Sequence, residues 1–507
     1  MIATLTEAIA GTALTLGKGD IIGDVYATPD EFAWLDIGYT TLKMIAFLLA
    51  SWIATTVNLR IIVVAATVMI TLVSAATALT TRLDLLIVLR AFQGGFSGGL
   101  LLVIGQIVIF RDFSPSRQPV LQALFATGAV VAPATIVPAL QGWLLDGYSW
   151  TWIFLSVVPI GLLAAGLVLL SEETSDNHIS YRRFDWSGLL LASITLFCLV
   201  YVLSQGDRWN WFDERRVQWL TGIGVVTLCL FVGQQASRPE DERLLELCVF
   251  RSVDFTFAFI VSFVAGAALF GSTYLIPSFA ISVLAFTPTD TGMLLLASSI
   301  LFVFSLFLSA FVFQGLGVSP IATVPFGIVM IMIAMWLLSG SAGDSGMDDM
   351  MNAVLLRGLS LGFLFLSITL IAFGRMGARS LPAAIGIFNT GRQFGGLLGI
   401  ACLQSLMTRN IAGNVSVLAS HITAGYTAVG DRLGTTAAVL EARGMNTAAA
   451  NQASKALLSK AVAYQSTVIA FDTAFFAIAL LFVFAAPILI VSKIILTRMA
   501  TAMKAPQ

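Results

Sequence analysis

The amino-acid sequence predicts an all-α polytopic membrane protein. Of its 507 residues, 58% are hydrophobic and only 11% are charged, whereas a soluble domain is about 45–50% apolar and about 25% charged. The apolar residues gather in runs of roughly 20, the length at which an α-helix crosses the hydrocarbon core of a bilayer. The runs are too long and too uniformly apolar for the alternating strands of a membrane β-barrel. We therefore expect lipid to surround most of the chain.

The apolar runs predict fourteen transmembrane helices. In chain order they cover residues 1–16, 32–54, 61–79, 85–110, 119–145, 150–170, 187–203, 217–234, 255–284, 289–313, 319–338, 350–373, 382–406 and 468–492. The first run is short because the chain opens inside it, so we expect a short first helix or a start codon upstream. One sizeable non-membrane segment remains, residues 407–467, and its Ala-rich stretches predict helices.

Lysine and arginine residues in the connecting loops indicate the orientation. With both termini in the cytoplasm, thirteen of these residues fall in cytoplasmic segments and five in short outer loops. Cytoplasmic loops of membrane proteins carry the excess of basic residues. The distribution therefore favours both termini inside and places loop 407–467 on the periplasmic side.

Two spans share a local pattern that suggests a duplicated architecture. Arg90 precedes a Gly-rich stretch in span 85–110, and Arg357 takes the matching place in span 350–373. Duplicated halves around a central site are typical of secondary transporters. The spacing predicts three parts: residues 1–170 as an N-terminal six-helix half, 171–254 as two inserted helices with linkers, and 255–507 as a C-terminal six-helix half that includes the loop.

Three passages carry a resemblance to a known family over essentially the whole chain. LIVLRAFQGGFSGG (86–99) is similar to a fourth-helix R-x-x-Q-G motif, VPALQGWLLDGYSWTWIFLSVVPIG (137–161) to a fifth-helix antiporter motif and the start of the sixth helix, and IGIFNTGRQFGGLLGIA (385–401) to a thirteenth-helix N-x-x-R-x-x-G-G pattern. The chain thus resembles the major facilitator superfamily, in its fourteen-helix drug:proton antiporter branch of the EmrB/QacA type.

The resemblance implies both a fold and an activity. The fold is the major facilitator fold, two six-helix bundles plus two extra central helices. The activity is proton-coupled export of hydrophobic and amphipathic compounds, or multidrug efflux, across a bacterial inner membrane. The proton gradient supplies the energy, and no cofactor is needed. Relatives in Gram-negative envelopes work with a periplasmic membrane-fusion adaptor and an outer-membrane channel, so loop 407–467 is either an adaptor-docking segment or a solvated cap.

The chain departs from the family pattern at three places. The loop between the second and third helices, SWIATTVNLR (51–60), keeps only Arg60 of the usual charged and glycine residues. Val137 and Gln141 replace common glycines of the antiporter motif, and the acid of the first helix moves by one residue to Glu7. These departures leave open an alternative of the same fold, a narrow-substrate permease or an importer.

Charged residues within the spans are the candidate proton-coupling groups. A charge at the bilayer centre costs about 2.5–3.5 kcal/mol on insertion scales, so such residues usually face a cavity or a partner. We predict coupling roles for Glu7, Asp36, Lys43 and Arg90. For Arg90 the alternative is a brace in which the guanidinium binds backbone carbonyls of a neighbouring helix. Arg357 lies nearer a membrane end, where snorkelling of its side chain is the favoured expectation.

Other residues in the three passages are candidates for the substrate cavity and for helix packing. The predicted cavity residues are Gln93, Phe92, Phe125, Asn389, Arg392 and Gln393. For Arg392, locking a glycine-lined helix contact is an equal alternative. The predicted gating and packing residues are Arg60, Gly94, Gly95, Gly98, Pro133, Pro138, Gly142, Gly395 and Gly396.

The composition argues against several other functions. A net charge of −1 gives no basic field for nucleic acid, and four cysteines without C-x-x-C spacing beside two histidines predict no metal site. The sequence contains no G-x-x-x-x-G-K-[ST] motif, so nothing in it indicates ATP-driven transport. No Ser-His-Asp or paired-carboxylate arrangement indicates an enzyme. The expected partners are membrane lipid, a small-molecule substrate and the periplasmic adaptor. A non-transporting scaffold or receptor is the remaining, disfavoured, alternative.

Overall fold

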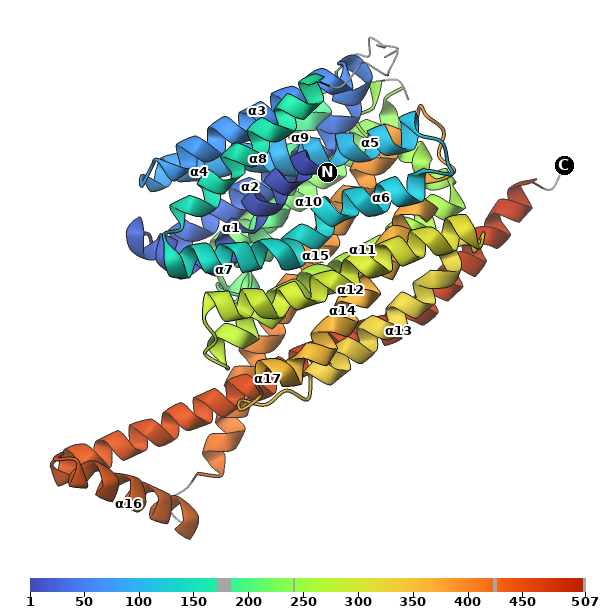
Figure 1. Ribbon diagram of the computed structural model, residues 1–507. Coiled ribbons are helices and arrows are strands. Elements are labelled where there is room, and N and C mark those ends of the chain that lie inside the picture. Colours follow the sequence, from blue (N-terminus) through green and yellow to red (C-terminus); the bar gives the residue numbers. More distant parts are fainter. Residues whose placement is uncertain (171–183, 240–241, 423–425, 505–507) are drawn as a thin grey trace.

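The computed structural model describes residues 1–170, 184–239, 242–422 and 426–504, and this part of the chain is helical without strands. Its helices form an elongated bundle, from one end of which a helical hairpin projects (Figure 1). The first group of helices, called here the N-terminal set, is α1 (Ile2–Asp24), α2 (Pro29–Thr56), α3 (Leu59–Ala78), α4 (Leu83–Gln93), η1 (Gly94–Leu101), α5 (Leu102–Asp112), α6 (Gln118–Ala126), η2 (Thr127–Ile136), α7 (Val137–Gly147) and α8 (Thr151–Leu170).

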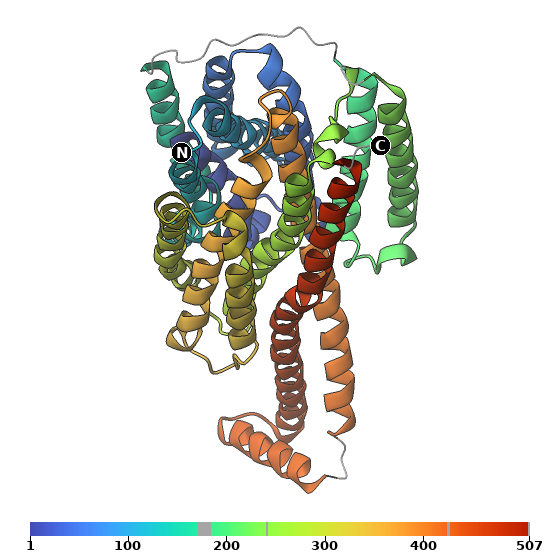
Figure 2. The same ribbon diagram turned by 90° about the vertical axis from the view of Figure 1, so that its right-hand side faces the viewer.

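The remaining elements form a lateral pair and a C-terminal set. The lateral pair consists of α9 (Trp186–Gln205) and α10 (Arg215–Ser237), joined through η3 (Trp211–Asp213) and followed by η5 (Leu247–Arg251). The C-terminal set consists of α11 (Val253–Ser282), α12 (Pro288–Gly315), α13 (Pro320–Leu338), α14 (Met347–Phe373), α15 (Leu381–Ser420), α16 (Thr427–Ala442) and α17 (Thr447–Lys504). Figure 2 shows the lateral pair standing beside the main bundle.

Twelve helices within the described residues are long and apolar enough to cross a membrane. They correspond to twelve of the fourteen predicted spans; the other two, 1–16 and 382–406, lie in α1 and α15. The expectation of a short first helix is wrong, since α1 has 23 residues. It continues past the apolar run because Lys18 and Asp20 are exposed on its surface and so need no partner in the core.

The described residues of segment 407–467 are mostly helical, as the composition predicts. It comprises the end of α15, the whole of α16 and the beginning of the 58-residue helix α17. Together they form the hairpin that projects from the bundle, at the end opposite the α5–α6 connection (Figure 1).

The second helix of each set, α2 and α12, begins in the same way. Thr28 caps α2 by accepting a hydrogen bond from the Glu31 backbone N–H, and the Glu31 carboxylate accepts one from the Thr28 N–H at 2.8 Å. Thr287 and Asp290 form the same capping box at the start of α12. A proline follows the cap in each case, where its missing N–H leaves no helical bond unmade. The two sets therefore share a local design as well as the Arg90 and Arg357 positions.

Glycines of η1 allow its backbone to contact α2 directly. A Cβ atom at Gly94 would overlap the Tyr39 carbonyl oxygen, and one at Gly98 would lie 2.8 Å from Cδ of Lys43. Small residues permit such close approach between membrane helices. Gly99 makes a similar contact with Ala46. Of the α2 residues contacted in this way, Tyr39 and Lys43 carry polar groups that take part in the buried cluster of the N-terminal set. The glycine face thus fixes the position of the polar residues described below.

The two sets meet through close helix contacts at one end and in the middle of the bundle. In α7, a Cβ at Gly142 would overlap the Pro288 carbonyl; conversely, a Cβ at Gly292 of α12 would lie 2.6 Å from Cα of Ala139. Beside them the Asp146 carboxylate accepts hydrogen bonds from the Thr289 backbone N–H at 3.0 Å and from its hydroxyl at 2.5 Å. Asp146 thus satisfies a free N–H in the first turn of α12.

The lateral pair is fastened at one end by the Asp185 carboxylate, which is 3% exposed. It caps α9 by accepting from the Gly188 N–H at 2.8 Å, and it also accepts from Gln235 at 2.8 Å and pairs with Arg238 at 3.2 Å. Burial acts to raise the pKa of Asp185, but these hydrogen bonds and the Arg238 charge outweigh it and hold the pKa below its ordinary value.

The contact of η1 with α2 predicts that alanine substitution lowers stability at one of two adjacent glycines and has little effect at the other. Gly94→Ala places a methyl group against backbone that cannot move aside, so we expect a loss of about 1–3 kcal/mol of stability. Gly95→Ala is the matched control, because its Cβ would meet only Leu42 Cβ at 3.8 Å. Thermal unfolding of the purified protein in detergent measures the difference. Equal midpoints for the two variants would contradict the packing described.

Asp185 predicts a pH-dependent contribution to stability. Because its pKa is lower in the folded state, the ionised carboxylate stabilises the fold above its ordinary pKa near 4, and this contribution is lost as the pH falls through the folded-state value. Asp185→Ala is expected to lower the unfolding midpoint at neutral pH, and the gap to wild type is expected to narrow under strongly acidic conditions. The exposed Asp213 near the other end of the pair serves as the control; an equal effect of Asp213→Ala would refute the assignment.

Candidate functional site

Glu7 of α1 and Lys43 of α2 form a buried ion pair inside the N-terminal set. The Glu7 Oε1 atom lies 2.7 Å from Lys43 Nζ and also accepts a hydrogen bond from the Tyr39 hydroxyl at 3.3 Å. Glu7 is 3% and Lys43 9% exposed. The structure therefore brings together two of the four residues predicted for proton coupling. The two residues come from different helices, so their ion pair also joins α1 to α2.

Arg90 lies in the same polar cluster and is 1% exposed. Its Nη1 atom donates to the Ala10 backbone carbonyl at 2.6 Å and to the Gln93 side chain at 2.8 Å, and its guanidinium stacks over the Tyr39 ring at 4.5 Å. The bond to Ala10 is the bracing contact considered as the alternative to coupling. Tyr39 nevertheless places Arg90 next to the Glu7–Lys43 pair, so the two roles are compatible in this geometry.

Asp36, the fourth predicted coupling residue, lies apart from the ion pair. Its side chain is exposed, and among the described residues no ion pair joins it to Lys43, which binds Glu7 instead. The cations that act on it electrostatically are Arg90 and Lys18. Asp36 is therefore an accessible carboxylate on the approach to the Arg90 cluster rather than a member of it.

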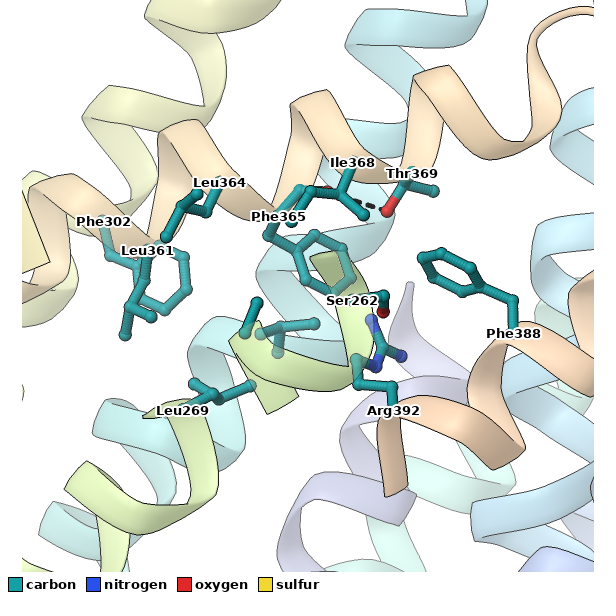
Figure 3. A pocket seen from close by; sticks show the side chains of 12 residues that line it. Ser262, Leu269, Phe302, Leu361, Leu364, Phe365, Ile368, Thr369, Phe388 and Arg392 are labelled. Atoms are coloured by element: carbon teal, nitrogen blue, oxygen red, sulfur yellow. Dashed lines mark hydrogen bonds between the residues drawn. The ribbon is translucent and has the colours of Figure 1, made fainter. Parts of the chain in front are cut away.

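A small cavity lies among helices of the C-terminal set, with Val130 of η2 from the N-terminal set also in its lining, and Arg392 is its charged lining residue (Figure 3). Figure 3 shows the Arg392 guanidinium reaching from α15 toward Phe365 of α14, with Phe388 beside it. The guanidinium lies 4.8 Å from the Phe365 ring centre and 5.8 Å from that of Phe388. Helices α11, α12 and α14 supply most of the other lining residues, which are largely apolar: Val130, Ser262, Ala265, Leu269, Phe302, Leu361, Leu364, Ile368 and Thr369.

The cavity is small in this conformation. Its free volume of about 30 Å³ accommodates roughly two water molecules and no drug-sized compound. An apolar cavity with one charged group can bind the hydrophobic part of a ligand and orient a polar part. Binding of a larger molecule requires the surrounding helices to separate.

Asn389 links the cavity to the N-terminal set. Its amide donates to the Gln106 side chain of α5 at 2.8 Å, while its carbonyl oxygen accepts from Arg392 Nη2 at 2.5 Å. A movement of α5 therefore reaches the cavity through Gln106 and Asn389.

Two residues of this site were not predicted from the sequence. Tyr39 lies one helical turn before Lys43, so the i, i+4 spacing already places both on one face. Gln106 is an isolated polar residue in the apolar run 101–110. A polar side chain at that depth needs a hydrogen-bond partner, and this signal was available in the sequence.

The other predicted cavity residues lie outside the cavity. Gln93 is buried and donates to the Ser74 and Thr77 hydroxyls of α3. Phe92 is 46% exposed on the bundle surface, and Phe125 is buried against Gly105. Gln393 is half-buried and does not line the cavity.

The predicted gating and packing residues lie at helix contacts. Gly395 and Gly396 of α15 pack against the Phe263 backbone and the Phe270 ring of α11. Pro133 lies within the π-helix η2, and Pro138 lies in the first turn of α7. Arg60 donates from Nη2 to the Leu169 carbonyl at 2.5 Å, which joins α3 to α8. Gly94, Gly98 and Gly142 make the contacts described above, whereas a Cβ at Gly95 would make only an ordinary van der Waals contact with Leu42.

Comparison with known proteins adds independent support for the fold. The sequence profile of the Major Facilitator Superfamily matches residues 1–400. The chain is 27% identical to the colistin resistance protein EmrB of Acinetobacter baumannii, over 78% of this chain and 76% of the relative. It is 24% identical to the multidrug export protein EmrB of Escherichia coli K12, over 80% and 78% of the two chains.

A solved structure has the same overall architecture. The human organic anion transporter MFSD10 (TETRAN) superposes with a TM-score of 0.53, covering 95% of this chain and 97% of its own at 12% identity, so the likeness concerns the fold alone. The matches to the family profile and to the export proteins together settle the classification. The chain belongs to the Major Facilitator Superfamily of membrane transporters, which are not enzymes, and is a homologue of the EmrB multidrug export proteins.

Proposed function

We propose that this transporter exports hydrophobic or amphipathic compounds across a bacterial inner membrane in exchange for protons. In this proposal all fourteen predicted helices span the membrane, both termini are cytoplasmic and the hairpin is periplasmic. The N- and C-terminal sets are the two halves that rock about the central contacts, while α9 and α10 are inserted between them in the chain. Homology to EmrB export proteins supports export as the direction of transport.

The observation that carries the proposal is the buried Glu7–Lys43 ion pair. Two charges in an apolar bundle are stabilised mainly by each other, and removing one leaves the other buried without compensation. Protonation of Glu7 removes the negative charge, so Lys43 and the neighbouring Arg90 then repel each other in a site of low dielectric constant. A conformation that hydrates Lys43 becomes favoured, and the proton has thereby shifted the equilibrium between two states of the transporter.

A continuous set of contacts supports coupling of the proton to the substrate. Lys43, the partner of Glu7, packs against the glycines of η1, and η1 continues directly into α5. Gln106 of α5 binds Asn389, which accepts a hydrogen bond from Arg392 in the cavity lining. In this proposal substrate binding at Arg392 and proton binding at Glu7 influence each other, as the reciprocity of linked binding requires.

Alternating access requires the two sets to part at one end at a time. The contacts of Gly142 with Pro288 and of Asp146 with Thr289 hold them together at the end that the proposed orientation makes periplasmic. Release of the substrate to the outside then requires these α7–α12 contacts to break.

A narrow-substrate permease or importer is the second candidate. The observation that favours it is the divergent loop 51–60, in which Arg60 binds the Leu169 carbonyl of its own set rather than a carboxylate. The direction of substrate movement decides between the two: accumulation inside right-side-out vesicles supports import, and extrusion supports export.

The hairpin supports a further part of the proposal, docking of a periplasmic adaptor. It is formed by long continuous helices, α15 and α17, and carries α16 at its tip. Val439 of α16, Met445 of the turn that follows it and Leu457 of α17 are exposed apolar side chains, and exposed apolar surface is a common feature of binding sites.

The coupling role of Glu7 predicts the loss of proton exchange in one variant. In proteoliposomes with an internal pH dye, Glu7→Gln is expected to abolish proton movement that depends on an exported drug. Asp36→Asn is expected to slow it, because Asp36 is an exposed carboxylate three residues before Tyr39, the ring on which Arg90 stacks. The control is Asp20→Asn, an exposed acid on the same helix. Wild-type coupling in both Glu7→Gln and Asp36→Asn would reject the mechanism.

Adaptor docking predicts site-specific crosslinks. A photoreactive amino acid at Val439 or Leu457, in cells that carry the native envelope, is expected to capture a membrane-fusion protein. The same probe at Trp219, an exposed residue of α10 within a span, is the control. If the hairpin positions capture no adaptor while the transporter still confers drug resistance, the hairpin is a solvated cap.

A further inference from the structure

The connection between the two helices of the lateral pair, residues 206–213, forms hydrogen bonds with the C-terminal set. Trp211 Nε1 donates to the Ser405 hydroxyl of α15 at 2.8 Å, and the Asp207 carboxylate accepts from the Thr408 hydroxyl at 2.8 Å. Figure 2 shows this connection at the end of the lateral pair that is nearer the hairpin. The connection is therefore bound to α15 close to the point where α15 leaves the bundle.

The same connection and the helix before it are attached to the N-terminal set. Arg208 Nε lies 2.5 Å from the Asp30 carboxylate in the first turn of α2. Along α9, the Trp34 ring of α2 stacks on Phe197 at 6.2 Å between ring centres and lies 5.5 Å from the ring of Tyr201. The lateral pair is thus packed along α2, and its hydrogen bonds to α15 join the N-terminal set to the C-terminal set.

The connection lies at the outer end of the line along which α2 and α15 touch. The two helices are antiparallel: a Cβ at Gly386 of α15 would lie 2.5 Å from the Phe47 carbonyl oxygen of α2, and Leu397 packs with the cluster that contains Ile37. The ion-pair partner of the connection on α2 precedes Ile37, and its partners on α15 follow Leu397. The connection therefore crosses from one set to the other at the end that the proposed orientation makes periplasmic.

The backbone of the connection is strained where it presents the tryptophan. Asn210 and Trp211 both have left-handed conformations, with φ of 50° and 56°, which are uncommon for residues other than glycine. The Trp211 ring lies against Gly206, where a Cβ would come within 2.6 Å of it, and the Trp211 N–H donates to the Gly206 carbonyl at 2.6 Å. Such a conformation persists only when surrounding contacts fix it, and the bond to Ser405 is one of these contacts.

We propose that the connection is a latch between the two sets, which holds their outer ends together and opens once in each transport cycle. This outer latch consists of Asp207 and Trp211 on the connection and of Ser405 and Thr408 on α15. When the outer ends separate, both hydrogen bonds to α15 break, while the connection stays on α2. The inference rests on the alternating access of the proposed function, and neither on its direction nor on its coupling to protons. It gives the inserted lateral pair a role in gating.

The separation of the outer ends is measured by pulsed electron paramagnetic resonance on the full-length transporter in lipid nanodiscs. Nitroxide labels are attached to p-acetylphenylalanine in place of Tyr26 and Asp344, exposed residues in the α1–α2 and α13–α14 connections. Trp211→Phe combined with Thr408→Val removes both hydrogen bonds of the outer latch and keeps side chains of similar shape. It is expected to raise the ratio of the long to the short label distance by about fivefold or more over the wild type.

Two variants of the same connection serve as controls. Trp209→Phe changes an exposed tryptophan two residues before Trp211 and is expected to keep the wild-type ratio. Arg208→Gln removes the ion pair with α2 and is expected to change the ratio by less than about twofold, because an exposed ion pair contributes little and α9 remains packed on α2.

A reversible crosslink tests whether the outer latch has to open. The four native cysteines are replaced by alanine, Asp207→Cys and Thr408→Cys are introduced, and a short bis-methanethiosulfonate reagent joins the two thiols. This crosslink is expected to leave only the short label distance, and dithiothreitol is expected to restore both distances. The matched crosslink between Arg208→Cys and Asp30→Cys joins parts that move together, so it is expected to leave both distances.

Four outcomes would overturn the inference. They are an unchanged ratio in Trp211→Phe with Thr408→Val, an equal rise in Trp209→Phe, a long distance that survives the crosslink to α15, and a long distance that disappears with the crosslink to α2. The label distances are measured without a proton gradient or an exported drug. Their result is therefore independent of the proton-exchange assay on Glu7→Gln, and failure of either proposal is distinguishable from failure of the other.

Discussion

The ion pair between Glu7 and Lys43 is the interaction on which the arrangement of the N-terminal helices depends. A lysine at this depth is stable only with a partner, and its partner lies on another helix. The pair requires α1 and α2 to lie side by side with their polar faces inward. The glycines of η1 allow a third helix to approach the same face, and Arg90 then enters the cluster over the Tyr39 ring. Structure and coupling chemistry therefore use the same few side chains.

The length of apolar runs predicted most of the architecture, because lipid permits few alternatives to a helix of about 20 residues. The length of apolar runs predicted less well the direction in which each side chain points around its helix. Phe92 and Gln93 are neighbours in one motif, yet a single step rotates a helical side chain by about 100°. Gln93 therefore points inward to α3 while Phe92 faces outward, 46% exposed.

Long-range partners explain the remaining differences between prediction and structure. The depth of Arg357 in its run suggested snorkelling, but the Ser272 and Thr273 hydroxyls of α11 hold it in the interior. Those partners lie more than 80 residues away in the sequence, and hydropathy carries no information about them. Gln106 and Asn389, nearly 300 residues apart, illustrate the same point. The signal that each residue needed a partner was present in the sequence, while the identity of the partner was not.

The continuity of α17 has a mechanical consequence. A single helix of 58 residues forms one arm of the hairpin and then runs on through the bundle, beside α11, α13 and α15. A tilt of the membrane part by about 10° displaces the end of an arm of about 20 residues by roughly 5 Å, at about 1.5 Å of length per residue. The position of the far end of the hairpin, outside the membrane, therefore changes with the conformation of the C-terminal helices.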